Sequence, residues 1–192
     1  MVALTTNIQI FGHSFVRRLK CFIRDNSDYN FNLNRDGHPL VQYSGFPGAT
    51  VTKLYNKVEH IVDFPPDLLF LVVGTNDIYD VSVSTEEVAN SIFNLAEVIH
   101  HQSKTHRIVI VQVLHRHPPS VAVRYPVDVD FYNSQVDQLN KRLGDFASTM
   151  PWCYFWKLKE FWAPNIKKHV FTADGCHLTD MGHKKLYINL IG

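Results

Sequence analysis

The sequence has no excess of charge of either sign, because 19 lysine and arginine residues face 18 aspartate and glutamate residues and leave a net charge of +1. This balance excludes a chain that coats nucleic acid through overall basic charge, and it also excludes an acidic solvating chain. Long apolar runs are missing too. The longest purely apolar run, Leu68 to Val73, is far too short to span a bilayer.

Cysteine is scarce, and the three residues present (Cys21, Cys153 and Cys176) form no CxxC pair and cannot all pair with one another. The segment Met1 to Asn7 lacks the charged and apolar stretches of a signal peptide. We therefore expect a reduced, cytoplasmic protein. Its length of 192 residues favours a single domain that spans residues 1–192. The chain starts close to the first expected strand and stops just past the last expected helix, which suggests a domain cut from a longer protein.

Strand and helix patterns alternate along the whole chain. Apolar runs predict five strands, at Asn7–Gly12, Leu40–Ser44, Leu68–Val73, Ile108–Leu114 and Cys153–Leu158. Helical spacing of apolar residues predicts five helices, at 15–24, from about 51 to 62, at 85–101, at 132–146 and after 179. This alternation predicts an α/β fold: a three-layer α/β/α sandwich with a five-stranded parallel sheet in the flavodoxin-like order 2-1-3-4-5.

In such a sheet, ligands bind beyond the carboxyl ends of the strands, where the strand order reverses between the first and third strands. Four polar or glycine-containing segments leave these strand ends or occupy the last long loop: Gly12–Ser14, Ser44–Thr50, Gly74–Asp77 and Asp174–Thr179. They bring a hydroxyl, two glycine turns, an amide side chain and a carboxylate–imidazole pair to one edge of the sheet. These groups are the parts of an acyl-transfer site.

Each polar residue of this set has a chemical role that fits acyl transfer. The hydroxyl of Ser14 is a nucleophile once a base removes its proton, and His177 is the candidate base. Asp174, three residues before it, can hold the Nδ1 atom of the imidazole and stabilise its charged form. The N–H groups of Ser14 and Gly48 and the side-chain amide of Asn76 can stabilise an oxyanion.

The same four segments resemble, in order, the four sequence blocks of the SGNH (GDSL-type) hydrolases. The matching stretches are Ile10-Phe-Gly-His-Ser14, Ser44-Gly-Phe-Pro-Gly48-Ala-Thr50, Val73-Gly-Thr-Asn76-Asp77 and Asp174-Gly-Cys-His177-Leu-Thr179. The resemblance covers about Ile8 to Leu186. It implies an esterase or lipase fold with the catalytic and oxyanion-hole roles given above. The GxSxG elbow of the α/β-hydrolases is absent, which favours the SGNH interpretation.

The chain departs from the family at position 13, where the family usually has Asp and this chain has His13. A carboxylate that would help to order the serine turn is therefore missing, which bears on the rate rather than on the reaction. The Gly-His-Ser-Phe variant also resembles esterase domains in the first open reading frame protein of LINE-type retrotransposons. That resemblance implies a larger parent protein.

We therefore expect a serine esterase that hydrolyses short-to-medium acyl esters, including lipid esters, through an acyl-enzyme intermediate and without a metal or organic cofactor. Five residues are expected to line the substrate site: His13, Phe161, Trp162, Val170 and Phe171. Two alternatives remain. One is a weakly active or non-enzymatic module that binds lipid, membrane or protein, and the other is a carbohydrate O-acetyl esterase.

Other chemistry-bearing residues fit ordinary structural roles better. Cys176 is a weak candidate for a thiol nucleophile, because its neighbour His177 follows it directly in a turn. The pairs His100-His101 and His115-Arg-His117 lack the closed ligand set of a zinc site. A basic helix face (Arg17, Arg18, Lys20 and Arg24) is typical of a solvated surface, with contact to anionic lipid or nucleic acid as the functional alternative. Direct binding of nucleic acid is not expected, because the sequence has neither a basic excess nor an aromatic platform motif.

Overall fold

Five strands form one parallel sheet in the computed structural model, which describes residues 6–34, 39–80, 82–124, 126–161 and 168–191. The strands are β1 (Asn7–Gly12), β2 (Leu40–Gly45), β3 (Leu68–Val72), β4 (Arg107–Val111) and β5 (Cys153–Trp156). They pair in the order β2-β1-β3-β4-β5, and every pairing is parallel. The order predicted from the sequence is confirmed.

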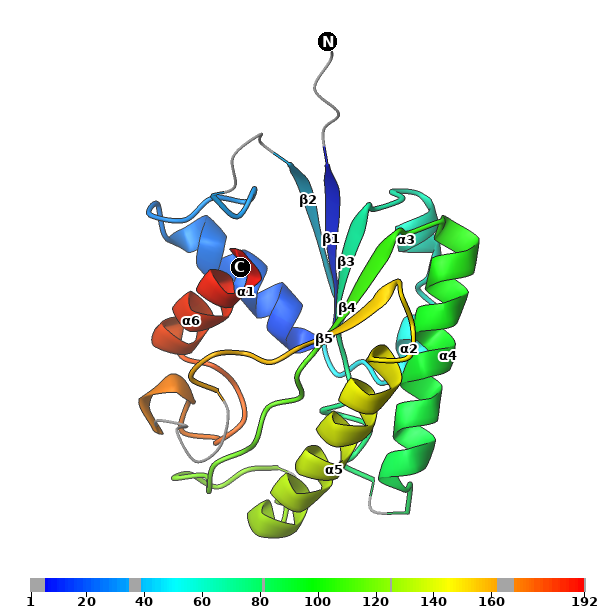
Figure 1. Cartoon of the computed structure of the whole chain (residues 1–192). Coiled ribbons are helices and arrows are strands. Elements are labelled where there is room, and N and C mark those ends of the chain that lie inside the picture. Colours follow the sequence, from blue (N-terminus) through cyan, green and yellow to red (C-terminus); the bar gives the residue numbers. More distant parts are fainter. Residues whose placement is uncertain (1–5, 35–38, 81, 125, 162–167, 192) are drawn as a thin grey trace.

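Helices cover both faces of the sheet (Figure 1). On one face lie α1 (Ser14–Asp25) and α6 (Asp180–Ile191), and on the other α2 (Val51–Tyr55), α3 (Glu59–Val62), α4 (Thr85–Ser103) and α5 (Val129–Ala147). A short 3₁₀ turn, η1, spans Lys168–Val170. None of the helices in the described part of the chain is long and apolar enough to cross a membrane.

The helix expected from Val51 to Val62 is instead two short helices. α2 ends where Asn56 forms its C-cap, and α3 begins at Glu59. Asparagine is a poor residue for a helix interior, because its side chain competes for the local backbone hydrogen bonds. The apolar spacing therefore continues across a break that spacing alone does not reveal.

Alternate strand residues belong to two separate hydrophobic cores, because successive side chains of a strand point to opposite faces of the sheet. Toward α2, α3, α4 and α5 the sheet presents Phe11, Leu69, Leu71, Ile108 and Ile110. Toward α1 and α6 it presents Ile8, Ile10, Phe70, Val72 and Val109. All ten side chains are buried. Burial on both faces explains why β3 and β4 read as continuous apolar runs.

Two glycines allow the start of α1 to lie close against the sheet. A Cβ atom on Gly12 would lie 2.1 Å from the carbonyl oxygen of Val72, and one on Gly45 would lie 2.2 Å from the backbone nitrogen of Arg17. Real Cβ atoms do not approach backbone atoms so closely. The turn after β1 is therefore fixed against both neighbouring strands, β2 and β3.

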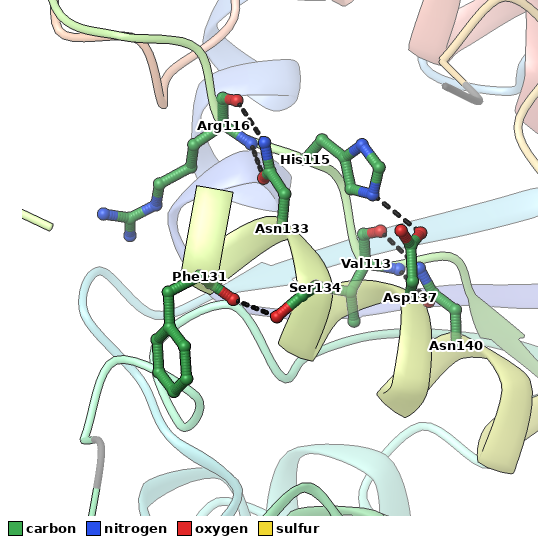
Figure 2. Close-up of polar contacts among 8 residues, drawn as sticks. All are labelled: Val113, His115, Arg116, Phe131, Asn133, Ser134, Asp137 and Asn140. Atoms are coloured by element: carbon green, nitrogen blue, oxygen red, sulfur yellow. Dashed lines mark hydrogen bonds and ion pairs between the residues drawn. The ribbon is translucent and has the colours of Figure 1, made fainter. Parts of the chain in front are cut away.

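Two asparagines of α5 hold the chain that leaves β4 (Figure 2). The Oδ1 atom of Asn140 accepts from the N–H of Val113 at 2.9 Å, and its Nδ2 atom donates to the carbonyl of Val113 at 2.8 Å. Asn133 makes the same pair of hydrogen bonds with the backbone of Arg116, at 2.8 and 2.9 Å. Residues 113–116 are thereby fixed along α5, and the long loop that follows starts from a defined point.

Asn140→Leu should lower the free energy of unfolding by about 3 kcal/mol, because it leaves the buried N–H and C=O of Val113 without partners and each such group costs roughly 1–3 kcal/mol. Urea-induced unfolding measures the change. Gln138→Leu, at an exposed position of the same helix, is the matched control and should stay within about 0.5 kcal/mol of wild type. A loss no larger in Asn140→Leu than in the control would show that these hydrogen bonds do not stabilise the loop.

Candidate active site

His13, not Ser14, caps the helix that follows β1. Its Nδ1 atom accepts from the N–H of Phe15 at 3.4 Å, and its own N–H donates to the carbonyl of Val72 at 3.1 Å. Ser14 is the first residue of α1. Because His13 performs the capping, the Ser14 hydroxyl is not needed for it, and no described residue hydrogen-bonds to that hydroxyl. The imidazole of His13 thus orders the serine turn, the role expected of the aspartate that the family usually has at this position.

Asp174 and His177 form a tightly hydrogen-bonded pair. The Nδ1 atom of His177 lies 2.6 Å from Oδ2 of Asp174. The other carboxylate oxygen, Oδ1, accepts from the backbone N–H groups of Cys176 and His177 at 2.9 Å each and from the Thr172 hydroxyl at 2.7 Å. Since an ionised carboxylate only accepts hydrogen bonds, Nδ1 carries the proton and the Nε2 atom of His177 is left as a base.

These hydrogen bonds decide the charge of Asp174. Partial burial alone would raise its pKa, but the hydrogen bonds from His177, Thr172 and the backbone outweigh burial and hold the pKa well below its ordinary value. The carboxylate is therefore ionised throughout the physiological pH range. An ionised carboxylate in this position fixes the orientation of the His177 ring.

The loop that carries this pair is fastened to the loop after β4. The N–H of His117 donates to the carbonyl of Gly175 at 2.8 Å, and the N–H of Ser120 donates to that of Ala173 at 2.8 Å. Gly175 has a φ of +70°, and a Cβ atom there would lie 2.0 Å from the His117 carbonyl oxygen. Only glycine allows this approach, so the position of His177 depends on it.

Two neighbouring loops carry Gly48 and Asn76 to the same edge of the sheet as Ser14. The Nδ2 atom of Asn76 donates to the carbonyl of Ala49 at 2.8 Å, which orients the amide and leaves its second N–H available. Gly48 has a φ of +65°, and apart from its chain neighbours no described residue comes within 4 Å of the place where a Cβ atom would lie. Asp77 ties the loops together, since its Oδ1 atom accepts from the N–H of Val51 at 2.8 Å. Burial raises the pKa of Asp77.

One cavity of about 700 Å³ brings the sequence-predicted residues together. Its lining includes Ser14, Gly48, Asn76, Asp174 and His177. Much of the remaining wall is apolar and comes from the loop between β4 and α5, including Pro119, Val121, Val123, Pro126 and Val127. The length and prolines of this loop were the only sequence signals that pointed to it, and they did not indicate which of its side chains face the site.

The residues expected to line the substrate site lie elsewhere, and that prediction is wrong for those the structure describes. Phe161 and Val170 are 0% exposed and Phe171 is 6% exposed, and all three belong to the core beneath α1 and α6. His13 is 2% exposed and supports the serine turn without lining the cavity. Trp162 lies outside the described residues. Phe161, Val170 and Phe171 instead pack in the apolar core on the face of the sheet that carries α1 and α6.

The alternative chemistries gain no support. Cys176 lines the cavity, but burial raises the pKa of its thiol, which disfavours the reactive thiolate. His115 is paired with Asp137 through its Nε2 atom at 2.8 Å, and His100 lies stacked on Trp152. In the stretches that the structure covers, no group of three or more His, Cys, Asp or Glu side chains could hold a metal ion.

Comparison with known proteins supports the resemblance to the SGNH (GDSL-type) hydrolases. The model of the GDSL-like lipase/acylhydrolase family matches residues 11–185. Similar solved structures include a GDSL-like lipase from Bacteroides thetaiotaomicron, at 17% identity and a TM-score of 0.69, covering 96% of this chain and 85% of that one. A member of the lipolytic protein G-D-S-L family from Veillonella parvula follows at 18% identity, a TM-score of 0.68 and 96% coverage of both chains. A carbohydrate esterase family 3 structure from Talaromyces cellulolyticus has 12% identity and a TM-score of 0.66, covering 97% and 94%.

The fold and the four segments around the cavity define a hydrolase of the SGNH type, as the resemblance of the sequence blocks implied. Because the family match spans most of its length, the chain belongs to the GDSL-like lipase/acylhydrolase family. Comparison with curated proteins found no match. The narrower resemblance to retrotransposon esterase domains stays a prediction.

His13 should make the protein less stable in acid. Burial, aided by the charge of His177, lowers its pKa from 6.5 to about 4. Between these values the unfolded chain binds a proton that the folded chain does not, so the free energy of unfolding falls as the pH falls. From about pH 7.5 to about pH 4.5 the loss from this residue is about 2–3 kcal/mol.

His13→Asn keeps a capping side chain that does not titrate, so its free energy of unfolding should fall by about 2 kcal/mol less than that of wild type over the same pH range. Urea unfolding at a series of pH values measures the difference, with the exposed His101→Asn as control. Identical pH dependence in wild type and His13→Asn would contradict a neutral, buried imidazole at position 13.

Proposed function

We propose that the protein is a serine esterase in which Ser14 is the nucleophile, His177 the general base and Asp174 the residue that orients the base. One observation carries the proposal: an ionised carboxylate fixes the Nδ1–H of an imidazole on the wall of the same cavity that Ser14 lines, and the Ser14 hydroxyl has no hydrogen-bond partner among the described residues. A hydroxyl and a base beside oriented N–H donors match the needs of acyl transfer.

The reaction proceeds in two balanced steps. The Oγ atom of Ser14 attacks the ester carbonyl carbon while Nε2 of His177 takes the hydroxyl proton, and the imidazolium then gives that proton to the departing alkoxide. Water next attacks the acyl-enzyme, with Nε2 of His177 again accepting a proton and returning it to Oγ as the acid leaves. In both steps the N–H groups of Ser14, Gly48 and Asn76 stabilise the negative oxygen.

The size and walls of the cavity support short-to-medium acyl esters as substrates. A volume of about 700 Å³ falls within the range of small-molecule sites, and the valines and prolines of its wall suit an acyl chain.

A second candidate is a carbohydrate O-acetyl esterase, favoured by the structural likeness to a carbohydrate esterase. Release of acetate from acetylated sugars by wild type but not by Ser14→Ala distinguishes that candidate. Contact with a membrane surface stays a prediction.

Ser14→Ala should abolish hydrolysis of p-nitrophenyl acetate and butyrate above the uncatalysed rate, because no other hydroxyl replaces the nucleophile. A fluorophosphonate probe should label wild type at Ser14, as located by mass spectrometry, and should not label the variant. Ser27→Ala, at an exposed position after α1, is the matched control and should keep wild-type turnover. Equal turnover in Ser14→Ala and wild type would remove Ser14 from the mechanism.

Asn76→Ala should lower kcat for p-nitrophenyl butyrate about 10²–10³-fold with little change in KM, because the lost donor acts mainly on the oxyanion of the transition state. Steady-state kinetics measures both constants. Asn94→Ala, on the exposed side of α4, controls for removal of an asparagine. A kcat within about threefold of wild type, well below the effect of a lost oxyanion donor, would exclude Asn76 from the oxyanion hole.

A further inference from the structure

Arg116 lies on the wall of the cavity and has no part in the proposed reaction steps. Its backbone is held by Asn133 on α5, and Figure 2 shows its side chain extending away from Asn133. The guanidinium carbon lies 4.4 Å from the centroid of the Tyr132 ring and 5.2 Å from that of the Tyr79 ring. Two aromatic rings therefore orient a planar cation at the cavity wall.

The charge of Arg116 is not balanced by a carboxylate among the residues that the structure describes. Arg24 and Arg142, in contrast, form ion pairs with Asp25 and Glu86. The Nε atom of Arg116 is buried and has no hydrogen-bond partner within the same residues. A buried donor without a partner costs free energy, so a bound group that accepts from this guanidinium would be stabilised.

Arg116 also lies close to the reacting groups. It faces the ring of Tyr132, whose hydroxyl donates at 3.0 Å to the carbonyl of Thr75, the residue before Asn76. The residue that follows it, His117, donates its N–H at 2.8 Å to the carbonyl of Gly175, in the loop that carries the base. Arg116 therefore lies near both the loop that carries Asn76 and the loop that carries the base.

The one carboxylate in the described cavity lining is not free to balance Arg116. It belongs to Asp174. That carboxylate is already engaged with His177. The cavity therefore favours a ligand with a negative charge.

We propose that the site acts on esters that also carry a carboxylate, and that Arg116 binds this carboxylate. The inference rests on the proposed esterase function and names its substrate class: half-esters of dicarboxylic acids, or esters of hydroxy acids. A single guanidinium balances one negative charge, and its fork of N–H groups matches the two oxygens of a carboxylate. The buried Nε–H, which has no partner among the described residues, is the donor left for this carboxylate.

Two matched pairs of substrates test this proposal. Mono-p-nitrophenyl adipate and p-nitrophenyl hexanoate have acyl chains of equal length and differ in the terminal carboxylate. p-Acetoxybenzoate and its methyl ester place the same difference on the alcohol side. For each pair, the ratio of kcat/KM for the anionic ester to kcat/KM for the neutral ester is measured in wild type and variants, after subtraction of spontaneous hydrolysis.

Arg116→Gln should lower this ratio about tenfold or more for at least one pair, the size expected for a lost charge-assisted hydrogen bond. Arg116→Lys keeps the charge but loses the fork, and should give a smaller decrease. Arg124→Gln, which removes the other cavity arginine, should change the ratio less than twofold, well below the loss expected for such a bond. Fluorophosphonate labelling of each variant shows that its active site is folded.

A ratio unchanged by Arg116→Gln for both pairs would overturn the inference, and so would an equal decrease in Arg124→Gln. If Arg116→Gln does not fold, an unchanged ratio in labelled Arg116→Lys for both pairs overturns it. Failure of the esterase proposal looks different, because wild type would then hydrolyse neither member of either pair and would not be labelled at Ser14.

Discussion

The arrangement of the site depends on the pairing of β1 with strands on both of its sides. The hydrogen-bonded ladder continues beyond the strand ends, where the N–H of Phe46 donates to the carbonyl of Gly12 at 2.8 Å and the N–H of His13 donates to that of Val72 at 3.1 Å. Three strands therefore end at one level. The segments that carry the hydroxyl, the positive-φ glycine and the amide leave the same edge of the sheet, although more than sixty positions separate the first from the last along the chain.

A second set of backbone hydrogen bonds completes the cavity from the other side. The carbonyls of Ala173 and Gly175 accept hydrogen bonds from the loop after β4, and the start of that loop is itself fixed to α5 by Asn133 and Asn140. The imidazole is thus positioned by a chain of contacts that runs through α5 rather than by its own loop alone. Side chains held by such supports keep the geometry that catalysis requires.

Sequence patterns predicted the strand order and the residues around the cavity because both follow from short-range rules. Apolar runs identify buried strands, and right-handed crossovers leave few orders for five of them. Polar residues at carboxyl ends of strands must then share an edge. The prediction that Phe161, Val170 and Phe171 line the substrate site is wrong for a physical reason too. Apolar character predicts burial, but it does not tell a core beneath α6 from the wall of a cavity.

The wall itself could not be predicted, because the loop between β4 and α5 has no periodicity that assigns its side chains to an inner or outer side. Arg116 in particular follows a strand end in the sequence like many solvated arginines. Its role depends on Tyr79 and Tyr132, which come from two other elements. Only the folded chain brings these rings to it.

His13 shows how a departure from the family pattern is accommodated. Its Nδ1 atom accepts the N–H of Phe15 as a carboxylate would, and burial lowers its pKa to about 4, so the ring is neutral at physiological pH. A positive charge on His177 also lowers the pKa of His13, because like charges disfavour each other. In the proposed reaction His177 becomes positively charged. A neutral imidazole at position 13 caps the helix beside it without adding a second positive charge, whereas an aspartate would add a negative one. The substitution therefore keeps the geometry of the serine turn and changes its electrostatics.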